Sequence, residues 1–203
     1  MKFQKVLNVF STYYNLLKLN SLGVVVGGKA RFCGDVVFCI NRPSKVVFGK
    51  GLIITGGYSI NALSPSERSC IWIIFSSRVI KKNERYNNCG FSSICISVHD
   101  SIRIGNNVVI GANTRLNDSN GHCINYLERR MERECKDWSK LNIDHAPIVI
   151  EDDVFIGACC IISKGITIGA RSIVAAGSVV VKSIPADEVW GGNPAKFIKK
   201  VSN

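Results

Sequence analysis

The chain has 203 residues, a formal net charge of +11 and a hydrophobic content of 46%. This length suits one domain with appendages, and no apolar run reaches the length that spans a membrane. The positive charge predicts an anionic partner. Because no helix-turn-helix, RNA-binding signature or aromatic-basic ladder is visible, we expect a phosphorylated small molecule and no nucleic acid.

Residues 1–22 predict a short amphipathic helix. Apolar side chains fall near helical spacing at Val6, Phe10, Tyr13, Tyr14 and Leu17. We expect the helix to cap the rest of the fold, and its basic character leaves peripheral contact with an anionic membrane surface open. Since no cleavable small-residue site follows, a secretory leader is not expected.

The nine cysteines do not resemble a disulfide framework. Their number is odd, no CxxC pair occurs, and several fall at apolar positions of the pattern described next. We therefore expect reduced thiols, a cytoplasmic protein and no metal site, and the inner face of the membrane stays open as its location.

An aliphatic side chain recurs at every sixth residue in the C-terminal half, and a small or apolar one follows four positions after each. The first set is Ile150, Ile156, Ile162, Ile168, Val174 and Val180, and the second is Val154, Cys160, Ile166, Ser172, Ser178 and Ile184. A period of six fits neither an α-helix nor a long strand, so the chain is expected to turn at fixed intervals and stack its coils into a solenoid. An ordinary β-sandwich would not keep so strict a period.

The same phase continues backwards and then breaks. Its earlier members are Leu116, Ile110, Ile104 and Val98, with Thr114, Val108, Ile102 and Ile96 as companions. Corners are expected at Gly105-Asn106-Asn107, Gly111-Ala112-Asn113 and Gly169-Ala170, because these residue types tolerate unusual backbone angles. We therefore predict an all-β solenoid over 23–186, a loop extruded at 117–147, and a tail over 187–203 with a short helix.

His122 is the candidate catalytic base. It stands where the chain leaves the coil, and loops that interrupt a rigid scaffold tend to carry function. Asp118 and the amides of Asn117 and Asn120 are close enough in sequence to fix its tautomer, and Gly121 allows a ligand to approach. A neutral imidazole is suited to removing a proton from an acceptor hydroxyl.

Stacking predicts a second group of residues near this point. If three hexads form one coil, residues 18 apart lie above each other, which places Asp100 beside Asp118 and His99 beside Asn117. We consider His99, Asp100 and Asn120 as acceptor-binding candidates. Solvated corner residues are an equally good interpretation of His99 and Asp100.

The ordered succession of motifs resembles the hexapeptide-repeat acyltransferases, in particular the maltose and galactoside O-acetyltransferase-like branch and, within it, enzymes that modify capsule and O-antigen polysaccharides. The matching segments are residues 104–111, 118–122, 147–158, 165–169, 176–180 and 190–196. The resemblance implies a left-handed parallel β-helix, a homotrimer with active sites between subunits, acetyl-CoA as donor, a sugar or glycan acceptor, and a catalytic histidine at the position of His122.

The same resemblance implies a donor site. The pantetheine arm is expected along small residues at Ala158 and Ala176, and the phosphates near basic residues at Lys182, Lys196 and Lys199. An aromatic residue near Trp190 is expected to contact the donor or acceptor, and subunit packing is the alternative. Phe155 stands where relatives commonly have Trp, so the indole donor is lost.

Three other functions remain open from the sequence. The same fold serves N-acetyltransferases of amino sugars or nucleotide-linked sugars. A zinc lyase of the carbonic anhydrase type would need three converging histidines, which the spacing does not favour. A non-catalytic assembly module would need no histidine at all. A Cys123–His122 nucleophile pair is disfavoured because neighbours in an extended segment point to opposite sides.

Overall fold

The computed structural model describes residues 2–21, 25–26, 29–33, 36–40, 47–48, 52–55, 69–73, 88–135 and 140–202. The sequence also suggests hexad positions at Ile60, Ile74 and Ile80 and a loop over 61–68, and these lie outside the described ranges.

The chain consists of one long helix, many short strands and a helical excursion. In order, these are α1 (Lys2–Ser21), β1 (Val25–Val26), β2 (Ala30–Cys33), β3 (Val36–Ile40), β4 (Val47–Phe48), β5 (Leu52–Thr55), β6 (Ser69–Ile73), β7 (Gly90–Ser92), β8 (Cys95–Val98), β9 (Ile102–Ile104), β10 (Val109–Ile110), β11 (Arg115–Asn117), α2 (Tyr126–Met131), a 3-10 helix η1 (Glu132–Glu134), β12 (Ile148–Ile150), β13 (Phe155–Ile156), β14 (Ile161–Ile162), β15 (Thr167–Ile168), β16 (Ile173–Val174), β17 (Val179–Val180), β18 (Glu188–Gly191) and β19 (Lys196–Lys200).

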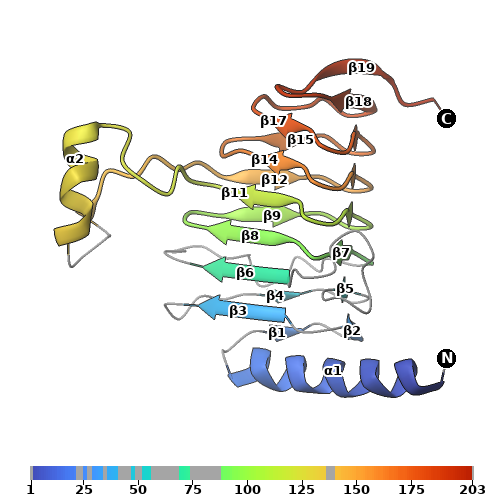
Figure 1. Cartoon of the computed structure of the whole chain (residues 1–203). Helices are drawn as coiled ribbons and strands as arrows, with labels where there is room; N and C mark the ends of the chain where they lie inside the picture. The colour runs from blue at the N-terminus through green and yellow to red at the C-terminus, as the bar shows by residue number, and fades with distance from the viewer. Residues whose placement is uncertain are drawn as a thin grey trace.

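The strands form a column of stacked coils (Figure 1). From β7 to β17, successive strands enter three sheets in turn. Sheet 1 contains β2, β5, β7, β10, β13, β16, β18 and β19, sheet 2 contains β3, β6, β8, β11, β14 and β17, and sheet 3 contains β9, β12 and β15. Neighbouring coils pair in parallel, for example Val109 with Phe155 and Ile161 with Val179. The predicted solenoid is therefore formed by three-sided coils of short parallel strands.

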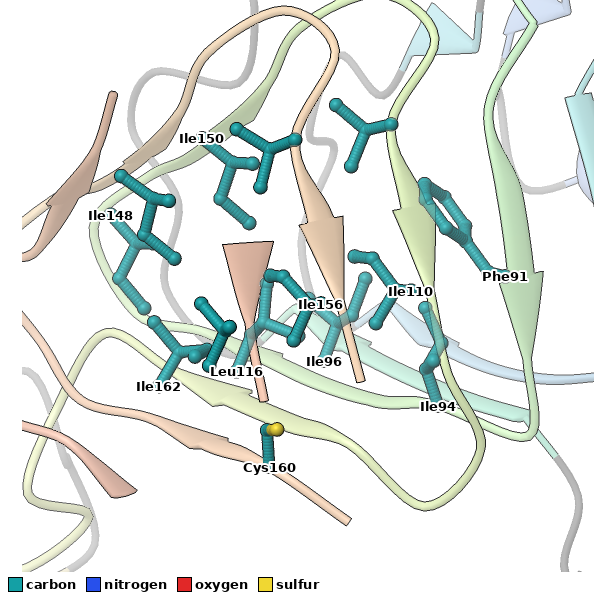
Figure 2. Close-up of a cluster of buried hydrophobic side chains, with 14 of the residues drawn as sticks. Phe91, Ile94, Ile96, Ile110, Leu116, Ile148, Ile150, Ile156, Cys160 and Ile162 are labelled. Atoms are coloured by element: carbon teal, nitrogen blue, oxygen red, sulfur yellow. The ribbon is translucent and has the colours of Figure 1, made fainter. Parts of the chain in front are cut away.

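The six-residue repeat places its apolar side chains in the interior, as predicted (Figure 2). All twelve hexad residues from Ile150 to Ile184 are at most 4% exposed. One coil cannot enclose these side chains, so each depends on the coils above and below it. The resulting apolar column is the hydrophobic core.

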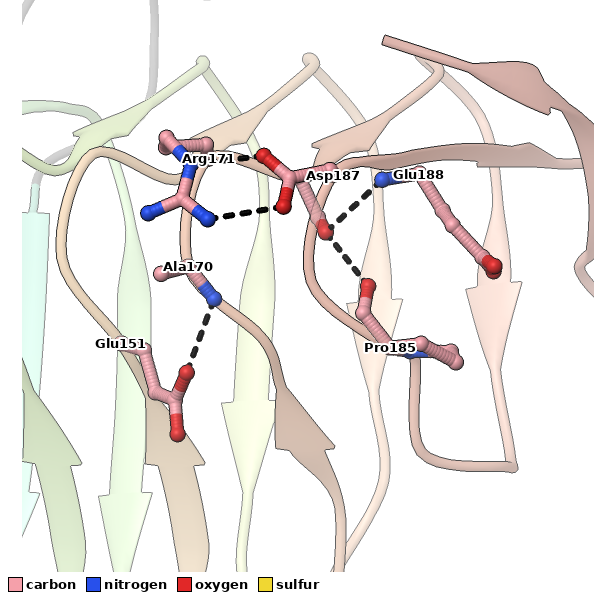
Figure 3. Close-up of polar contacts among 7 residues, drawn as sticks. Glu151, Ala170, Arg171, Pro185, Asp187 and Glu188 are labelled. Carbon is pink, nitrogen blue, oxygen red and sulfur yellow. Dashed lines mark hydrogen bonds and ion pairs between the residues drawn. The ribbon is translucent and has the colours of Figure 1, made fainter.

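The corners between sheets are held by backbone geometry and polar contacts. Asn107 and Asn113 adopt positive φ angles of 56° and 60°, in agreement with the predicted corners. Between later coils, Arg171 forms a two-pronged ion pair with Asp187 at 2.6 and 2.7 Å, and the Ala170 N–H donates to Glu151 (Figure 3). These contacts connect consecutive coils at their edges.

One coil departs from the predicted register. Stacking at intervals of 18 pairs Leu116 with Val98, but the structure pairs Leu116 with Ile96 and Asn117 with Ser97. Both Ile96 and Val98 are buried, at 7% exposure each. Because alternate positions of this segment are all apolar, the hexad phase did not reveal that the interval from Ile96 to Leu116 is 20 residues and not 18.

The C-terminal end of the column is closed by strands, and the short helix expected within 187–203 is not formed over the described residues of this tail. Strands β18 and β19 pair antiparallel, with Trp190 opposite Phe197. Lys200 forms a 2.7 Å ion pair with the buried Glu188, which also accepts the Trp190 indole N–H at 2.7 Å. This network fixes the turn of the chain where the helix was expected.

Helix α1 lies across the opposite, N-terminal end of the column (Figure 1). Leu19 and Asn15 are fully buried, and the Thr12 hydroxyl lies 3.1 Å from both the N–H and the carbonyl oxygen of Phe32 in β2. Across the described residues, no helix combines the length and hydropathy needed to cross a bilayer.

Val180 and Val181 provide a matched test of the column. Val180 is 0% exposed and its neighbour Val181 is 49% exposed. We expect Val180→Ala to lower the free energy of unfolding by about 2 kcal/mol, because it removes two buried methyl groups and leaves a cavity. Val181→Ala should change it by less than about 0.5 kcal/mol. Urea unfolding of both variants measures the difference, and equal losses would contradict the inward assignment.

Candidate functional site

The site is built on an excursion from the column between β11 and β12. Val109 pairs with Phe155 across the excursion, whereas Phe155 pairs with Ile173 in the following coil. The first of these intervals is more than twice the second, so the excursion is inserted into a single coil. Its two ends lie side by side, because Ser119 pairs antiparallel with His145 and the Asn120 N–H donates to the Asp144 carbonyl oxygen at 3.0 Å.

The excursion folds back on itself through α2 and η1, and projects from the side of the column (Figure 1). The Asn125 side chain caps α2 by accepting the Leu127 N–H at 2.8 Å. The Arg129 guanidinium donates to the carbonyl oxygens of Cys123 and Ile124 at 2.9 and 3.0 Å. These contacts return the chain toward its starting point, so that η1 lies against the residues that precede α2.

This folding brings Glu132 to His122. The His122 Nδ1 lies 2.7 Å from a Glu132 carboxylate oxygen, and the other oxygen accepts the Cys123 N–H at 2.6 Å. The Glu132 side chain is 5% exposed, whereas His122 is 65% exposed. A buried carboxylate therefore holds one edge of an otherwise accessible imidazole.

The same contacts favour the ionised form of the Glu132 carboxyl. The backbone hydrogen bond from Cys123 and the contact with His122 hold the pKa of the Glu132 carboxyl below its usual value. An ionised carboxylate accepts hydrogen bonds and donates none, so the neutral ring is protonated at Nδ1. In this tautomer the lone pair lies on Nε2, on a ring that is 65% exposed.

Asp118 was expected to orient His122, but its side chain binds the backbone of the preceding coil. Its side chain is fully buried, and its two oxygens accept the backbone N–H groups of His99 and Asp100 at 2.7 and 2.8 Å. Burial raises the pKa of the Asp118 carboxyl. The carboxylate thus holds the preceding coil's corner, and the imidazole of His122 is oriented by Glu132.

His99 and Asp100 lie at the base of the excursion together with His145. The imidazole centroids of His99 and His145 are 4.7 Å apart, and His145 Nδ1 lies 3.9 Å from an Asp100 carboxylate oxygen. Burial, and next the neighbouring His145, lower the pKa of His99. Asp100 lies beside Asp118, as stacking predicts, because Asp118 accepts the Asp100 N–H, and His99, expected beside Asn117, donates its N–H to the same carboxylate.

Cys123 is unsuited to a nucleophilic role. Its side chain is 1% exposed, and burial together with the adjacent Glu132 raises the pKa of the thiol. A thiolate is the reactive form of cysteine, so this environment disfavours the chemistry. Within the described ranges, no three His, Cys, Asp or Glu side chains are grouped as metal ligands.

Ala158 and Ala176 lie on one edge of the column, on successive coils. The Gly177 N–H donates to the Ala158 carbonyl oxygen at 2.8 Å. A Cβ atom added to Gly157 would lie 2.5 Å from the Ala176 nitrogen, so only glycine permits this spacing. Ala158 is half-buried and Ala176 is exposed, which leaves a narrow edge lined by small side chains.

The other predicted donor-site residues lie toward the C-terminal end of the column. Lys182, Lys196 and Lys199 are exposed. Trp190 is partly buried against the hydrophobic core, and its indole N–H is used by Glu188. Asn120, an acceptor-site candidate, is exposed at the base of the excursion.

Sequence reasoning missed Glu132 and His145. Both lie in the part of the chain that has no hexad period, so spacing gives no indication of which acidic residue returns to His122. The break in register correctly identified the segment, and the backbone path of α2 and η1 was needed to identify the partners.

The chain is similar to known acetyltransferases over its repeats. Residues 88–117 and 147–182 match the hexapeptide repeat of succinyl-transferase. A putative acetyltransferase from Schizosaccharomyces pombe is 37% identical over 116 residues, which cover 57% of this chain and 49% of that protein. The chain therefore spans about half the length of this curated relative.

Two further similarities extend the comparison. A 2,3,4,5-tetrahydropyridine-2,6-dicarboxylate N-acetyltransferase from Clostridium perfringens is 58% identical over 55 residues, which cover 27% of this chain and 23% of that enzyme. A hexapeptide-repeat acetyltransferase from Vibrio cholerae, solved in complex with acetyl-coenzyme A, has a TM-score of 0.54 and 26% sequence identity, and the match covers 93% of this chain and 76% of that one.

Substitution of Asp118 tests its structural assignment. We expect Asp118→Ala to lower the free energy of unfolding by about 2–3 kcal/mol, because the N–H groups of His99 and Asp100 lose a charged acceptor. Asp118→Asn should also destabilise the folded protein, since its amide nitrogen is a donor and would face one of the two backbone N–H groups. Thermal and urea unfolding measure both effects, and an unchanged Asp118→Ala variant would contradict the assignment.

Proposed function

We propose that this protein, whose repeats match those of the hexapeptide-repeat acyltransferases, transfers an acetyl group from acetyl-CoA to a hydroxyl of a sugar. The acceptor class is a cell-surface polysaccharide or its precursor, such as a capsule or O-antigen glycan. The contact between His122 and the buried Glu132 is the observation that carries this proposal. It provides a positioned, solvent-accessible base at the break in the repeats.

The reaction is a direct transfer. The acceptor hydroxyl oxygen attacks the thioester carbonyl carbon while its proton passes to Nε2 of His122. Glu132 stabilises the resulting imidazolium through Nδ1, as a carboxylate does in other oriented histidine bases. When the tetrahedral intermediate collapses, the C–S bond breaks and the proton passes to the departing thiolate, giving an ester and free CoA. Holding both substrates together makes the attack effectively intramolecular.

The donor is expected to run along the edge of the column formed by Ala158 and Ala176, where small side chains expose the backbone. Its phosphates would interact with Lys182, Lys196 and Lys199 as point charges. Trp190 would contribute an apolar edge, since its indole N–H is engaged by Glu188. His99, Asp100 and Asn120 at the base of the excursion are the proposed acceptor contacts, and His145 joins them.

A homotrimer of left-handed columns is the proposed assembly. Sheet 1 presents an outward row of apolar side chains in register, in which Ile53, Val109 and Phe155 are 42%, 47% and 46% exposed. Such a row is suited to burial against another subunit. A reducing cytoplasm is the proposed location, where the acetyl donor is available and the free thiols persist.

N-acetylation of an amino sugar or nucleotide-linked sugar is the second candidate. The observation that favours it is the match to an N-acetyltransferase with 58% identity over 55 residues. CoA thiol release, measured against a panel of bacterial glycans and amino sugars, distinguishes the two. Hydroxylamine cleaves an ester product and leaves an amide intact. Turnover only with amine acceptors would replace the O-acetyl proposal, and the absence of turnover in the whole panel would favour a non-catalytic assembly module.

Removal of the base should abolish most of the activity. We expect His122→Ala to lower kcat by about two to four orders of magnitude, the range typical of a general base. The mass of the assembly should remain unchanged, and the thermal midpoint should fall only slightly, because His122 is exposed and Glu132 keeps the Cys123 N–H. Steady-state kinetics with the best acceptor of the panel provide the measurement, and an undiminished kcat would rule out His122 as the base.

Glu132 should act through His122, as a positioning residue. We expect Glu132→Gln to lower kcat at least about tenfold while the KM for the acetyl donor changes little, because the glutamine amide no longer holds an imidazolium with a negative charge. Glu134→Gln, which removes the same charge at an exposed position of η1, is the matched control and should retain full activity. Equal kcat in the two variants would contradict the assignment.

A further inference from the structure

Helix α1 packs on the column with only one of its faces. Asn15 and Leu19 are fully buried, Leu16 packs against the core, and Thr12 contacts the backbone of Phe32. This face is polar at two positions and contributes few large apolar side chains. The aromatic residues that predicted an amphipathic helix are not part of it.

Those aromatic residues lie on the outside. The α1 outer face is formed by Val9, Phe10, Tyr13, Tyr14 and Leu17, whose exposed fractions range from 54% to 70%. Because side chains three or four positions apart are neighbours on a helix, these residues lie along one side of it. The helix caps the column as expected, but it does so with its other face, so an apolar surface remains at the N-terminal end of the column.

The charge of this end of the chain has a single sign. The sequence before Asp35 contains Lys2, Lys5, Lys18, Lys29 and Arg31 and no acidic residue. Lys29 and Arg31 are exposed next to and within β2, the strand on which α1 packs. An aromatic and aliphatic face accompanied by basic residues is complementary to an anionic lipid surface, where aromatic rings favour the interface and basic side chains favour the headgroups.

We propose that the α1 outer face docks the protein on the surface of a bilayer that contains anionic phospholipids, with the helix lying in the plane of the interface. A second copy of the chain is a less suitable occupant. In a two-fold contact each subunit presents the same surface, so the basic residues would face one another without acidic partners from this segment. The inference does not rest on the acetyl-transfer proposal, and either one can fail without the other.

Vesicle sedimentation of the full chain tests the proposal. We expect binding to vesicles of phosphatidylcholine with about one third phosphatidylglycerol, and much weaker binding to phosphatidylcholine alone. Binding should fall strongly between about 0.1 M and about 0.5 M salt, because the Debye length shortens over this range. No binding to the anionic vesicles, or equal and salt-independent binding to both kinds, would overturn the proposal.

Variants separate the apolar and electrostatic contributions. Phe10→Ser combined with Tyr13→Ser should weaken binding at least about tenfold, since both side chains would leave the interface. Lys29→Gln combined with Arg31→Gln should weaken it by about fivefold per basic residue, the equivalent of roughly 1 kcal/mol each at an anionic surface. Ile198→Ser is the matched control, because this side chain is 55% exposed on β19 at the opposite end of the column, and it should bind like the unsubstituted protein.

The competing occupant has a distinct signature. If α1 pairs two copies of the chain, the mass in solution should fall by half in the Phe10→Ser, Tyr13→Ser variant and the vesicles should not bind either protein. That result would overturn the proposal. An unchanged mass together with the loss of vesicle binding supports it.

Discussion

The architecture depends on the stacking of coils of nearly constant length. Each inward aliphatic side chain is buried by equivalent side chains one coil above and below, and each parallel strand pair fixes the register of the next. Extra residues cannot be accommodated within a strand, since they would move its apolar side chains out of the column. They must leave at a corner and return to it. The antiparallel contact of Ser119 with His145 allows β12 to resume pairing as if the excursion were absent.

The same constraint determines how far the sequence predicts the fold. Between residues 148 and 184 each inward position is aliphatic or small, and polar or small residues mark the corners, as at 151–153 and 169–171. Only one assignment of inward positions fits this pattern, and the burial of these side chains confirms it. Around β8, Ile96 and Val98 are both buried, and the pattern pairs Leu116 with either of them equally well. Backbone pairing resolves this ambiguity. At the C-terminus, Lys196–Lys200 alternates too little to distinguish an exposed strand from a helix.

The site was predictable where it depends on the column and not where it depends on the excursion. The break in period places His122 at the start of the excursion, and its role as the base is the proposal made above. Proximity in sequence suggested Asp118 as its partner, but Asp118 still belongs to the corner and its side chain is directed to the backbone of the previous coil. Glu132, further along the excursion, becomes the partner because α2 and η1 reverse the chain. The Cys123 N–H and then His122 lower the pKa of the Glu132 carboxyl, whereas burial raises the pKa of the Asp118 carboxyl.

The positions of α1 and the excursion bear on the nature of the acceptor. Helix α1 closes the N-terminal end of the column with its outer face turned away from the coils, and the excursion projects from the side of the column (Figure 1). Within sheet 2, three steps separate β3 from β11, after which the chain departs toward His122. At about 4.8 Å per step, the base of the excursion lies roughly 15 Å from the first coil, so a protein docked through α1 would hold its histidine above the headgroups and open to the side. A glycan that extends from a lipid reaches such a height, whereas a sugar held within the headgroup layer does not.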